Sequence, residues 1–270
     1  MRTLLICHEH AALDREGLAR WLGSFSAYAG TVVIREPGGR LRKRILREMH
    51  RVGFWRFLDV VAFRVYYWLR QAAKDRRVED RELEQLRARF PDLPAAPQQL
   101  VGSPNSPDAE AFIRRCEPDL VIARCKTLLH ERLFSIPRLG TYVMHPGICP
   151  EYRNAHGCFW AMAAGDVANV GVTLLRIDAG VDTGPVFGYF RVHADPLESH
   201  VVTQHRAVLE HLDTIREKLR EIENGTAVPV NTTGHASATW GQPWLSAWIR
   251  MRAATWRGQP RGLKSETSRS

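Results

Sequence analysis

Cysteine is scarce in this sequence of 270 residues. The five cysteines that occur show none of the paired spacings of a disulfide scaffold. A few unpaired cysteines are typical of proteins from a reducing compartment, so we expect a cytoplasmic protein. The apolar N-terminal segment turns polar by His8 and is too short for the core of a signal peptide, which favours the same expectation.

A hydrophobic run long enough to cross a membrane is also lacking. The most apolar stretch, residues 54–69, is interrupted by Arg56, Asp59 and Arg64, whereas a membrane-spanning helix needs about 20 mostly apolar residues. We interpret this stretch as part of a helix pair packed on a core. A membrane-surface or partner-binding element is the alternative.

Acidic residues are outnumbered, because 29 Asp and Glu face 38 Lys and Arg, which gives a net charge of +9. Most of the excess is arginine, found in residues 40–87 and after residue 250. A basic balance permits nucleic acid, anionic membranes or phosphorylated small molecules as partners and does not choose among them. We expect solvated helix faces and no nucleic-acid partner.

Short apolar segments alternate with helical ones along much of the chain. Strands are predicted at residues 3–7, 31–34, 120–123, 140–144, 170–177 and 186–192. Helices are predicted at residues 14–22, 41–87, 108–116 (capped by Asp108), 128–134 and 159–164, and a proline-rich loop at 91–107. This alternation predicts an α/β fold in which a mostly parallel sheet has helices on both faces.

The domain organisation follows from the same reading. We expect an α/β domain over residues 1–192, with a helical insertion at about 41–90. Residues 198–224 have helical periodicity, with Gly225 as the C-terminal cap. Residues 193–258 are predicted to pack on the domain through this helix and a Trp-rich segment, and residues 259–270 to be disordered. The tryptophans of that segment are Trp240, Trp244, Trp248 and Trp256.

Two segments carry residues suited to catalysis, 145–154 and 171–184. Each follows a predicted strand, so we expect each at the edge of the sheet where open α/β folds bind ligands. His145 can act as a general acid or base near neutral pH. Asp182, on a glycine-containing loop, can orient that imidazole, relay protons through water and stabilise its charged form.

These two segments resemble the formyltransferase family, which includes methionyl-tRNA, glycinamide ribonucleotide and sugar-nucleotide amine formyltransferases. The first motif is His-Pro-Gly at 145–147, followed by Pro-Glu-Tyr-Arg-Asn at 150–154. The second is Gly-Val-Thr at 171–173, followed by Asp-Ala-Gly-Val-Asp-Thr-Gly at 178–184. Upstream, residues 118–121 and 136–140 are similar to the preceding strand and helix of the family, so the resemblance covers residues 116–190.

The resemblance implies a Rossmann-like domain that binds 10-formyltetrahydrofolate as the formyl donor. It also implies that His145 and Asp182 belong to the Asn-His-Asp constellation of the family. The folate ring would lie against the backbone of two segments and beside Asp182. These segments contain Lys126, Thr127, Leu128, Leu129, Ile177, Asp178 and Val181.

Three positions depart from the family pattern. Val143 stands where the family has an asparagine and cannot donate to the formyl oxygen, a loss that typically costs about 10²–10³ in rate. Gly147 replaces the usual serine, and Asn154 replaces the usual glycine. We expect the side chain of Asn154 to supply the missing donor, with a backbone N–H near Gly147 or a water as the next possibility.

The acceptor side departs from the family as well. Cys-His-Glu-His at residues 7–10 stands where the glycinamide enzyme has its phosphate-binding Gly-x-Gly loop, which argues against a purine-pathway role. The chain also lacks room for the C-terminal β-barrel of the tRNA enzyme. We therefore predict a small amine acceptor, such as an amino sugar, contacted by His8, His10 and Arg124, with structural or surface roles as the alternative for these three residues.

Other functions stay open at this point. A hydrolase on the same fold would release formate to water, and an inactive ligand-binding domain would use its aromatic helix and Trp-rich segment to dock a partner or membrane. His145, Cys149, His156 and Cys158 do not have the spacing of a common zinc site, so no metal is predicted.

Overall fold

A seven-stranded sheet organises the chain in the order β3-β2-β1-β4-β5-β7-β8. The computed structural model describes residues 1–35, 41–195 and 198–256. The strands are β1 Arg2–His8, β2 Ala27–Ile34, β3 Gln98–Val101, β4 Leu120–Arg124, β5 Gly140–His145, β7 Gly171–Arg176 and β8 Val186–Arg191. The first five are parallel, and β7 runs antiparallel to both of its neighbours. The α/β, Rossmann-like fold with a mostly parallel sheet is confirmed.

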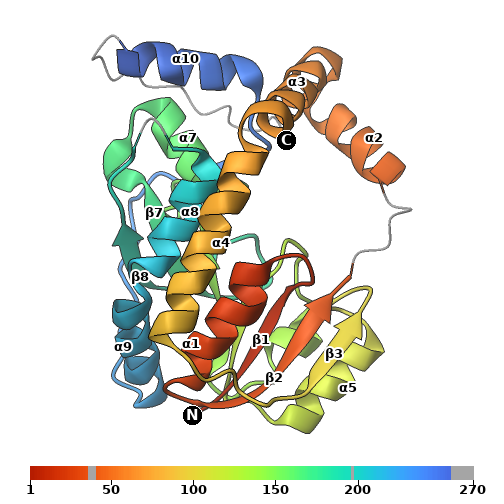
Figure 1. Cartoon of the computed structure of the whole chain (residues 1–270), viewed down its shortest axis with the longest axis vertical. Helices are drawn as coiled ribbons and strands as arrows, with labels where there is room; N and C mark the ends of the chain where they lie inside the picture. Colours follow the sequence, from red (N-terminus) through yellow and green to blue (C-terminus); the bar gives the residue numbers. More distant parts are fainter. Residues whose placement is uncertain (36–40, 196–197, 257–270) are drawn as a thin grey trace.

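Helices cover both faces of this sheet (Figure 1). One face packs against η1 Leu13–Leu18, α1 Ala19–Gly23, α4 Ala72–Arg89, α7 Gly157–Ala164, α8 His200–Leu209 and α9 Leu212–Glu223. The other face packs against α5 Pro107–Cys116 and α6 Glu131–Phe134. Residues Leu4–Cys7 of β1 are all buried, as expected for a central parallel strand covered on both sides.

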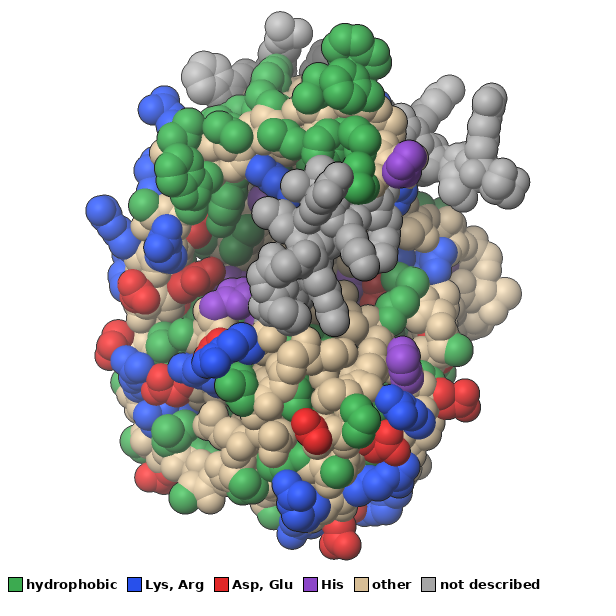
Figure 2. All heavy atoms as spheres, turned by 90° about the vertical axis from the view of Figure 1, so that its right-hand side faces the viewer, with side chains coloured by type: hydrophobic (Ala, Val, Ile, Leu, Met, Phe, Trp, Pro, Cys, Tyr) green, Lys and Arg blue, Asp and Glu red, His purple; other side chains and the backbone are tan. Residues whose placement is uncertain are grey.

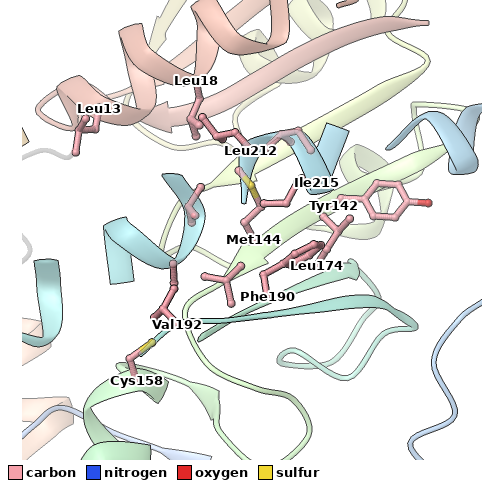
Figure 3. Packing of buried hydrophobic residues seen from close by; sticks show 14 of the residues in the cluster. Leu13, Leu18, Tyr142, Met144, Cys158, Leu174, Phe190, Val192, Leu212 and Ile215 are labelled. Atoms are coloured by element: carbon pink, nitrogen blue, oxygen red, sulfur yellow. The ribbon is translucent and has the colours of Figure 1, made fainter. Parts of the chain in front are cut away.

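The larger core cluster joins the sheet to its C-terminal helices. Figure 3 shows Leu212 and Ile215 of α9 meeting Met144 of β5 and Leu174 of β7. In α9, the buried positions recur at steps of three and four residues and end at Ile222. Helix α9 ends before Gly225, whose φ of 71° confirms the predicted C-terminal cap.

Several predicted boundaries were wrong. The predicted loop at 91–107 contains the short edge strand β3, and Ser106, not Asp108, caps α5, with Pro107 in the first turn. The predicted helix at 128–134 begins only at Glu131. Residues 198–224 form two helices, α8 and α9, instead of one.

The segment expected to be a core-packed helix pair forms three helices, α2 Leu41–Val52, α3 Phe54–Arg70 and α4. Only α4 lies along the sheet; α3 packs with α10 Leu245–Trp256 at one end of the molecule (Figure 1). Val60 and Phe63 of α3 are buried, but Trp55 is 81% and Trp68 69% exposed. The core-packing prediction therefore holds for one face of α3 and was wrong for the other.

The Trp-rich segment packs on the domain as expected. Trp240 stacks on Trp160 of α7, with ring centroids 4.9 Å apart, and Trp248 meets Tyr66 of α3 at 4.4 Å. The side chain of Trp256 and the predicted disordered tail at 259–270 lie outside the described residues. Within the part of the chain that the structure describes, no helix is long and apolar enough to cross a membrane.

Candidate active site

His145 is the last residue of β5, and its imidazole is buried, with 3% exposure. Its Nε2 atom lies 2.9 Å from the carbonyl oxygen of Tyr152, and its Nδ1 atom lies 3.3 Å from Oδ2 of Asp182. A carbonyl oxygen can only accept, so Nε2 carries the proton of that hydrogen bond. The two candidate catalytic side chains therefore lie within direct reach of each other.

Asp182 reaches this position by a route that the sequence did not predict. Because β7 is antiparallel, His145 pairs with Thr173, and the end of β7 at Arg176 pairs with Tyr142, away from His145. The expectation that both segments follow strands at the same sheet edge was therefore wrong. The loop after β7 instead turns back along the sheet to bring Asp182 to the imidazole.

Local hydrogen bonds fold this loop back. The carboxylate of Asp178 accepts from the backbone N–H of Gly180 and from the hydroxyl of Thr183, at 2.9 and 2.8 Å. Gly184 passes so close to the backbone of Arg176 that a Cβ would lie 1.9 Å from its carbonyl oxygen. Asp182 itself adopts a φ of 51°, which Asp tolerates better than most residues.

Both ring nitrogens of His145 face acceptors. Neutral imidazole has one N–H, so it can satisfy the Tyr152 carbonyl or the Asp182 carboxylate, but not both. The imidazolium has two N–H groups and satisfies both partners. The Tyr152 carbonyl and the Asp182 carboxylate therefore lie on opposite sides of the imidazole and orient it.

Asn154 enters the site through its backbone and not through its side chain. Its backbone N–H donates to Oδ2 of Asp182 at 2.8 Å, whereas its side-chain Nδ2 donates to the carbonyl of Trp240 at 2.6 Å. The expectation that this side chain replaces the family asparagine was therefore wrong as to its placement. The φ of Asn154 is 76°, a conformation in which glycine is unstrained and asparagine is tolerated, so glycine and asparagine are interchangeable here.

Val143 lies two residues before His145 and so on the same face of β5. It packs with Leu175, Cys149 and Val186, which form a small apolar cluster. The cluster supplies no side-chain amide at the family's asparagine position. Burial raises the pKa of the Cys149 thiol well above its ordinary value, so this cysteine is not a thiolate nucleophile.

Gly147 and Gly157 allow the closest packing in the site. A Cβ on Gly147 would lie 2.5 Å from the Tyr152 carbonyl and 3.1 Å from Nε2 of His145, and a Cβ on Gly157 would lie 2.5 Å from Cα of Gly147. The serine of the family pattern therefore does not fit at position 147. Sequence reasoning missed Gly157, the Tyr152 carbonyl and Thr173, whose buried hydroxyl donates to the Gly147 carbonyl at 2.6 Å and accepts from the Cys149 N–H at 3.0 Å. The Gly-Val-Thr motif that contains Thr173 was the available signal.

The two segments expected to bind folate lie on the same side of the sheet. Ile177 packs on the cluster that contains Leu129. Leu128 is exposed, and so is Lys126, whose N–H donates to Nε2 of His8 at 3.3 Å. An exposed apolar side chain beside main-chain groups suits a flat heteroaromatic ring. The remaining predicted contacts, Thr127, Asp178 and Val181, lie in these same two segments, and their roles stay predictions.

The predicted acceptor contacts are placed unequally. His8 is buried and His10 exposed, with ring centroids 5.5 Å apart. Arg124 is 3.0 Å from Asp14 and donates to the carbonyl of Met144 at 2.6 Å. These bonds link the ends of β4 and β5 to η1. They therefore favour a structural role for Arg124 over a contact with the acceptor.

Two further histidines lie beside the site and were not assigned a role from sequence. His156 adjoins Gly157, and burial lowers its pKa to about 4. Its ring centroid is 5.1 Å from that of His200, whose pKa burial also lowers. Across the described ranges, no group of three or more His, Cys, Asp or Glu side chains is arranged to hold a metal ion.

Comparison with known proteins accounts for the motifs. The family model described as formyl transferase matches residues 82–215. Methionyl-tRNA formyltransferase of Thermotoga neapolitana is 30% identical over 137 residues, which are 50% of this chain and 43% of that protein. The enzyme of the same name from Pseudomonas entomophila is 36% identical over 96 residues, 35% of this chain and 30% of that protein. The chain thus matches less than half the length of these relatives.

Solved structures with little sequence identity share the fold. A phosphoribosylglycinamide formyltransferase from Anaplasma phagocytophilum superposes with a TM-score of 0.54 at 13% identity, covering 90% of this chain and 99% of that one. A sugar N-formyltransferase from a Shewanella species gives a TM-score of 0.55 at 10% identity, covering 93% and 86%. With the matched sequence motifs and this common fold, the chain belongs to the formyltransferase family.

Proposed function

We propose that this protein transfers the formyl group of 10-formyltetrahydrofolate to the amine of a small molecule, with an amino sugar as the leading candidate. The observation that carries the proposal is the buried His145, held between the Tyr152 carbonyl and the Asp182 carboxylate. This pair lies within the family-matched residues, next to the two segments that suit a flat folate ring. The choice of an amino sugar over glycinamide ribonucleotide rests on residues 7–10, where Cys-His-Glu-His replaces the phosphate-binding Gly-x-Gly loop of the glycinamide enzyme.

The chemistry needs two contributions from the protein. Negative charge develops on the formyl oxygen as the amine attacks, and the attacking amine must lose a proton. In its charged form, His145 stabilises the formyl oxygen through its Nδ1–H. Nδ1 lies 3.3 Å from Oδ2 of Asp182, so this N–H can be shared between the carboxylate and the formyl oxygen. Asp182 holds that charge and receives the amine proton, directly or through one water. The proton then passes to N10 of tetrahydrofolate as the bond between N10 and the formyl carbon breaks.

Asp182 is itself positioned by the chain. The backbone N–H of Asn154 fixes its Oδ2, and the Trp240 carbonyl anchors the side chain of Asn154. Val143 leaves the formyl oxygen without the family's amide donor. A second donor must therefore be water or the acceptor itself, and we expect turnover to depend strongly on the acceptor.

The test is an assay of tetrahydrofolate release from 10-formyltetrahydrofolate, with sugar-nucleotide amines, glycinamide ribonucleotide or water as the acceptor. Product formation with an amino sugar supports the proposal. Release of formate without any amine identifies the hydrolase alternative. Folate binding without turnover identifies an inactive ligand-binding domain.

The missing amide donor can be tested separately by Val143→Asn. A gain in turnover number would show that the site works without a second protein donor, whereas no gain would show that another group supplies it. Asn154→Gly serves as the matched control, because it keeps the backbone N–H that holds Asp182 while removing the side chain.

A further inference from the structure

Helix α3 has two apolar faces, and among the residues that the structure describes only one of these faces is covered. Val60 and Phe63 face inward and are buried. The opposite face forms one stripe at steps of four, three, four and three residues along the helix. Its exposed side chains are Phe54, Leu58, Val61, Val65 and Trp68, with Trp55 and Leu69 beside them. A helix on the surface of a soluble monomer normally places polar residues on such a face.

The same end of the molecule holds almost all of the net charge. Helices α2, α3 and α10, here called the end layer, contain ten Lys and Arg and two Asp and Glu, a balance of +8 out of +9 for the whole chain. The remaining sequence therefore has 28 basic and 27 acidic residues. Both acids of the layer are already engaged: Glu48 with Arg51, and Asp59 with the backbone N–H of Ser246. Figure 2 shows hydrophobic side chains gathered at this end of the molecule.

The match to the family model does not extend to the end layer. The family model matches residues 82–215, and α2, α3 and α10 all lie outside that range. The layer is nonetheless fixed to the domain. Phe63 packs 5.6 Å from Phe159 and 5.7 Å from His200, measured between ring centroids, and Ser246 of α10 binds Asp59 of α3.

We propose that the end layer is a docking surface for a bilayer of anionic phospholipids. A helix with Trp, Phe and Leu on one face and arginines around it is the type that lies in the plane of the membrane interface. The 17 residues of α3 span about 25 Å, at about 1.5 Å per residue, and Trp55 and Trp68 stand near the two ends. Tryptophan prefers this interfacial depth, and each arginine adds attraction to anionic headgroups.

The charge of the layer decides against a second copy of this chain as its cover. A symmetric dimer through α3 would bring together two end layers that each have a sequence charge of +8, and like charges oppose such pairing. The inward face of α3 is already packed on the protein, so only its outer face can enter the lipid. The end layer is therefore suited to an anionic membrane surface and not to a second copy of itself.

Sedimentation of the full chain with phospholipid vesicles tests the proposal. We expect binding to vesicles of phosphatidylcholine with about a quarter phosphatidylglycerol, weak binding to phosphatidylcholine alone, and loss of binding as salt rises. The double variant Trp55→Ser with Trp68→Ser should bind the anionic vesicles at least about tenfold more weakly. Arg70→Glu with Arg250→Glu should weaken binding to anionic vesicles and leave binding to neutral ones unchanged.

The matched control is Leu93→Ser with Val228→Ser, which removes exposed apolar side chains from outside the layer. It should bind as the unmodified chain does, and all variants should keep the unmodified circular dichroism spectrum. Absence of binding to anionic vesicles would overturn the proposal, as would equal binding to neutral vesicles. A dimer in solution that Trp55→Ser with Trp68→Ser dissociates would show that a second copy covers the layer and would equally overturn it.

Discussion

The His145 site and the end layer differ in how their side chains are packed and exposed. In the site, His145 and Asp182 are held by the Tyr152 carbonyl and the Asn154 backbone N–H, and two glycines pack against each other with no space for a methyl group. In the end layer, Trp55 and Trp68 of α3 are mostly exposed, and the sequence of the layer contains ten Lys and Arg. The comparison teaches that the site is fixed by close packing of the domain, whereas the outer face of the layer is free to vary without cost to the fold.

The largest stability effect should come from the glycine pair. Gly157→Ala places a Cβ 2.5 Å from Cα of Gly147, where only backbone can move, so we expect a loss of about 2–3 kcal/mol in the free energy of unfolding. Denaturant unfolding measures it. Gly102→Ala is the control, because it also replaces a glycine by alanine but the added Cβ meets nothing within 4 Å. An unchanged midpoint for Gly157→Ala would mean that the site is less tightly packed than described.

The buried histidines should make the fold labile to mild acid. Burial lowers the pKa of His156 to about 4 from an ordinary value near 6.5, so below about pH 6.5 the unfolded chain takes up a proton that the folded protein rejects. The stabilisation from keeping His156 neutral is therefore present above pH 6.5 and is lost as the pH falls toward 4. His200, whose pKa is lowered in the same way, adds to this loss.

We expect His156 to contribute about 2 kcal/mol of the stability lost between pH 7.5 and 5, and His200 to add to that loss. The measurement is the free energy of unfolding at the two pH values, for the unmodified chain and for His156→Gln. The variant should lose less stability between the two pH values than the unmodified chain. Equal losses would show that His156 titrates normally in the fold.

A smaller effect should separate the backbone of Asn154 from its side chain. Asn154→Ala places an alanine at a φ of 76° and removes the side-chain hydrogen bond to the Trp240 carbonyl. We expect the free energy of unfolding to fall by about 1 kcal/mol. Asn154→Gly should be tolerated and should keep the backbone N–H bond to Asp182. Thermal unfolding of the two variants side by side is the check, and a Gly variant less stable than the Ala variant would contradict this account.

The smallest effect belongs to the end layer. Trp55→Ser with Trp68→Ser removes two mostly exposed side chains, so the free energy of unfolding should change by no more than about 0.5 kcal/mol. Differential scanning calorimetry would show a larger loss if these side chains packed on the protein. Such a loss would also remove the contrast between the two regions.

The sequence predicted the fold and most of its strands because buried parallel strands such as β1 read as continuous apolar runs. It missed β3, a four-residue edge strand in a proline-rich segment. The conformation of this segment depends on pairing with β2 and not on its local residues. It identified His145 and Asp182 through motif resemblance. It could not show that β7 is antiparallel, because strand direction depends on which elements pair across the sheet.

The misplacement of Asn154 has a similar origin. Its position in the motif suggested a side-chain donor, but the Trp240 carbonyl, 86 residues further along the chain, takes that donor. For α3, the sequence left a core-packed helix and a membrane-surface or partner-binding element as alternatives, because apolar residues recur around most of this helix and both faces resemble a core face. The placement of the Asn154 side chain and the exposure of α3 both depend on long-range contacts.

The most direct test of the account is a double-mutant cycle on His145 and Asp182, read by formyl transfer to the best amine acceptor. His145→Ala and Asp182→Asn should each lower kcat by about 10³-fold, and the double variant should lose little more, because the two groups act as a unit. Circular dichroism should show an unchanged fold in all three variants. Full activity in His145→Ala, or strictly multiplicative losses in the double variant, would contradict the paired His145–Asp182 site.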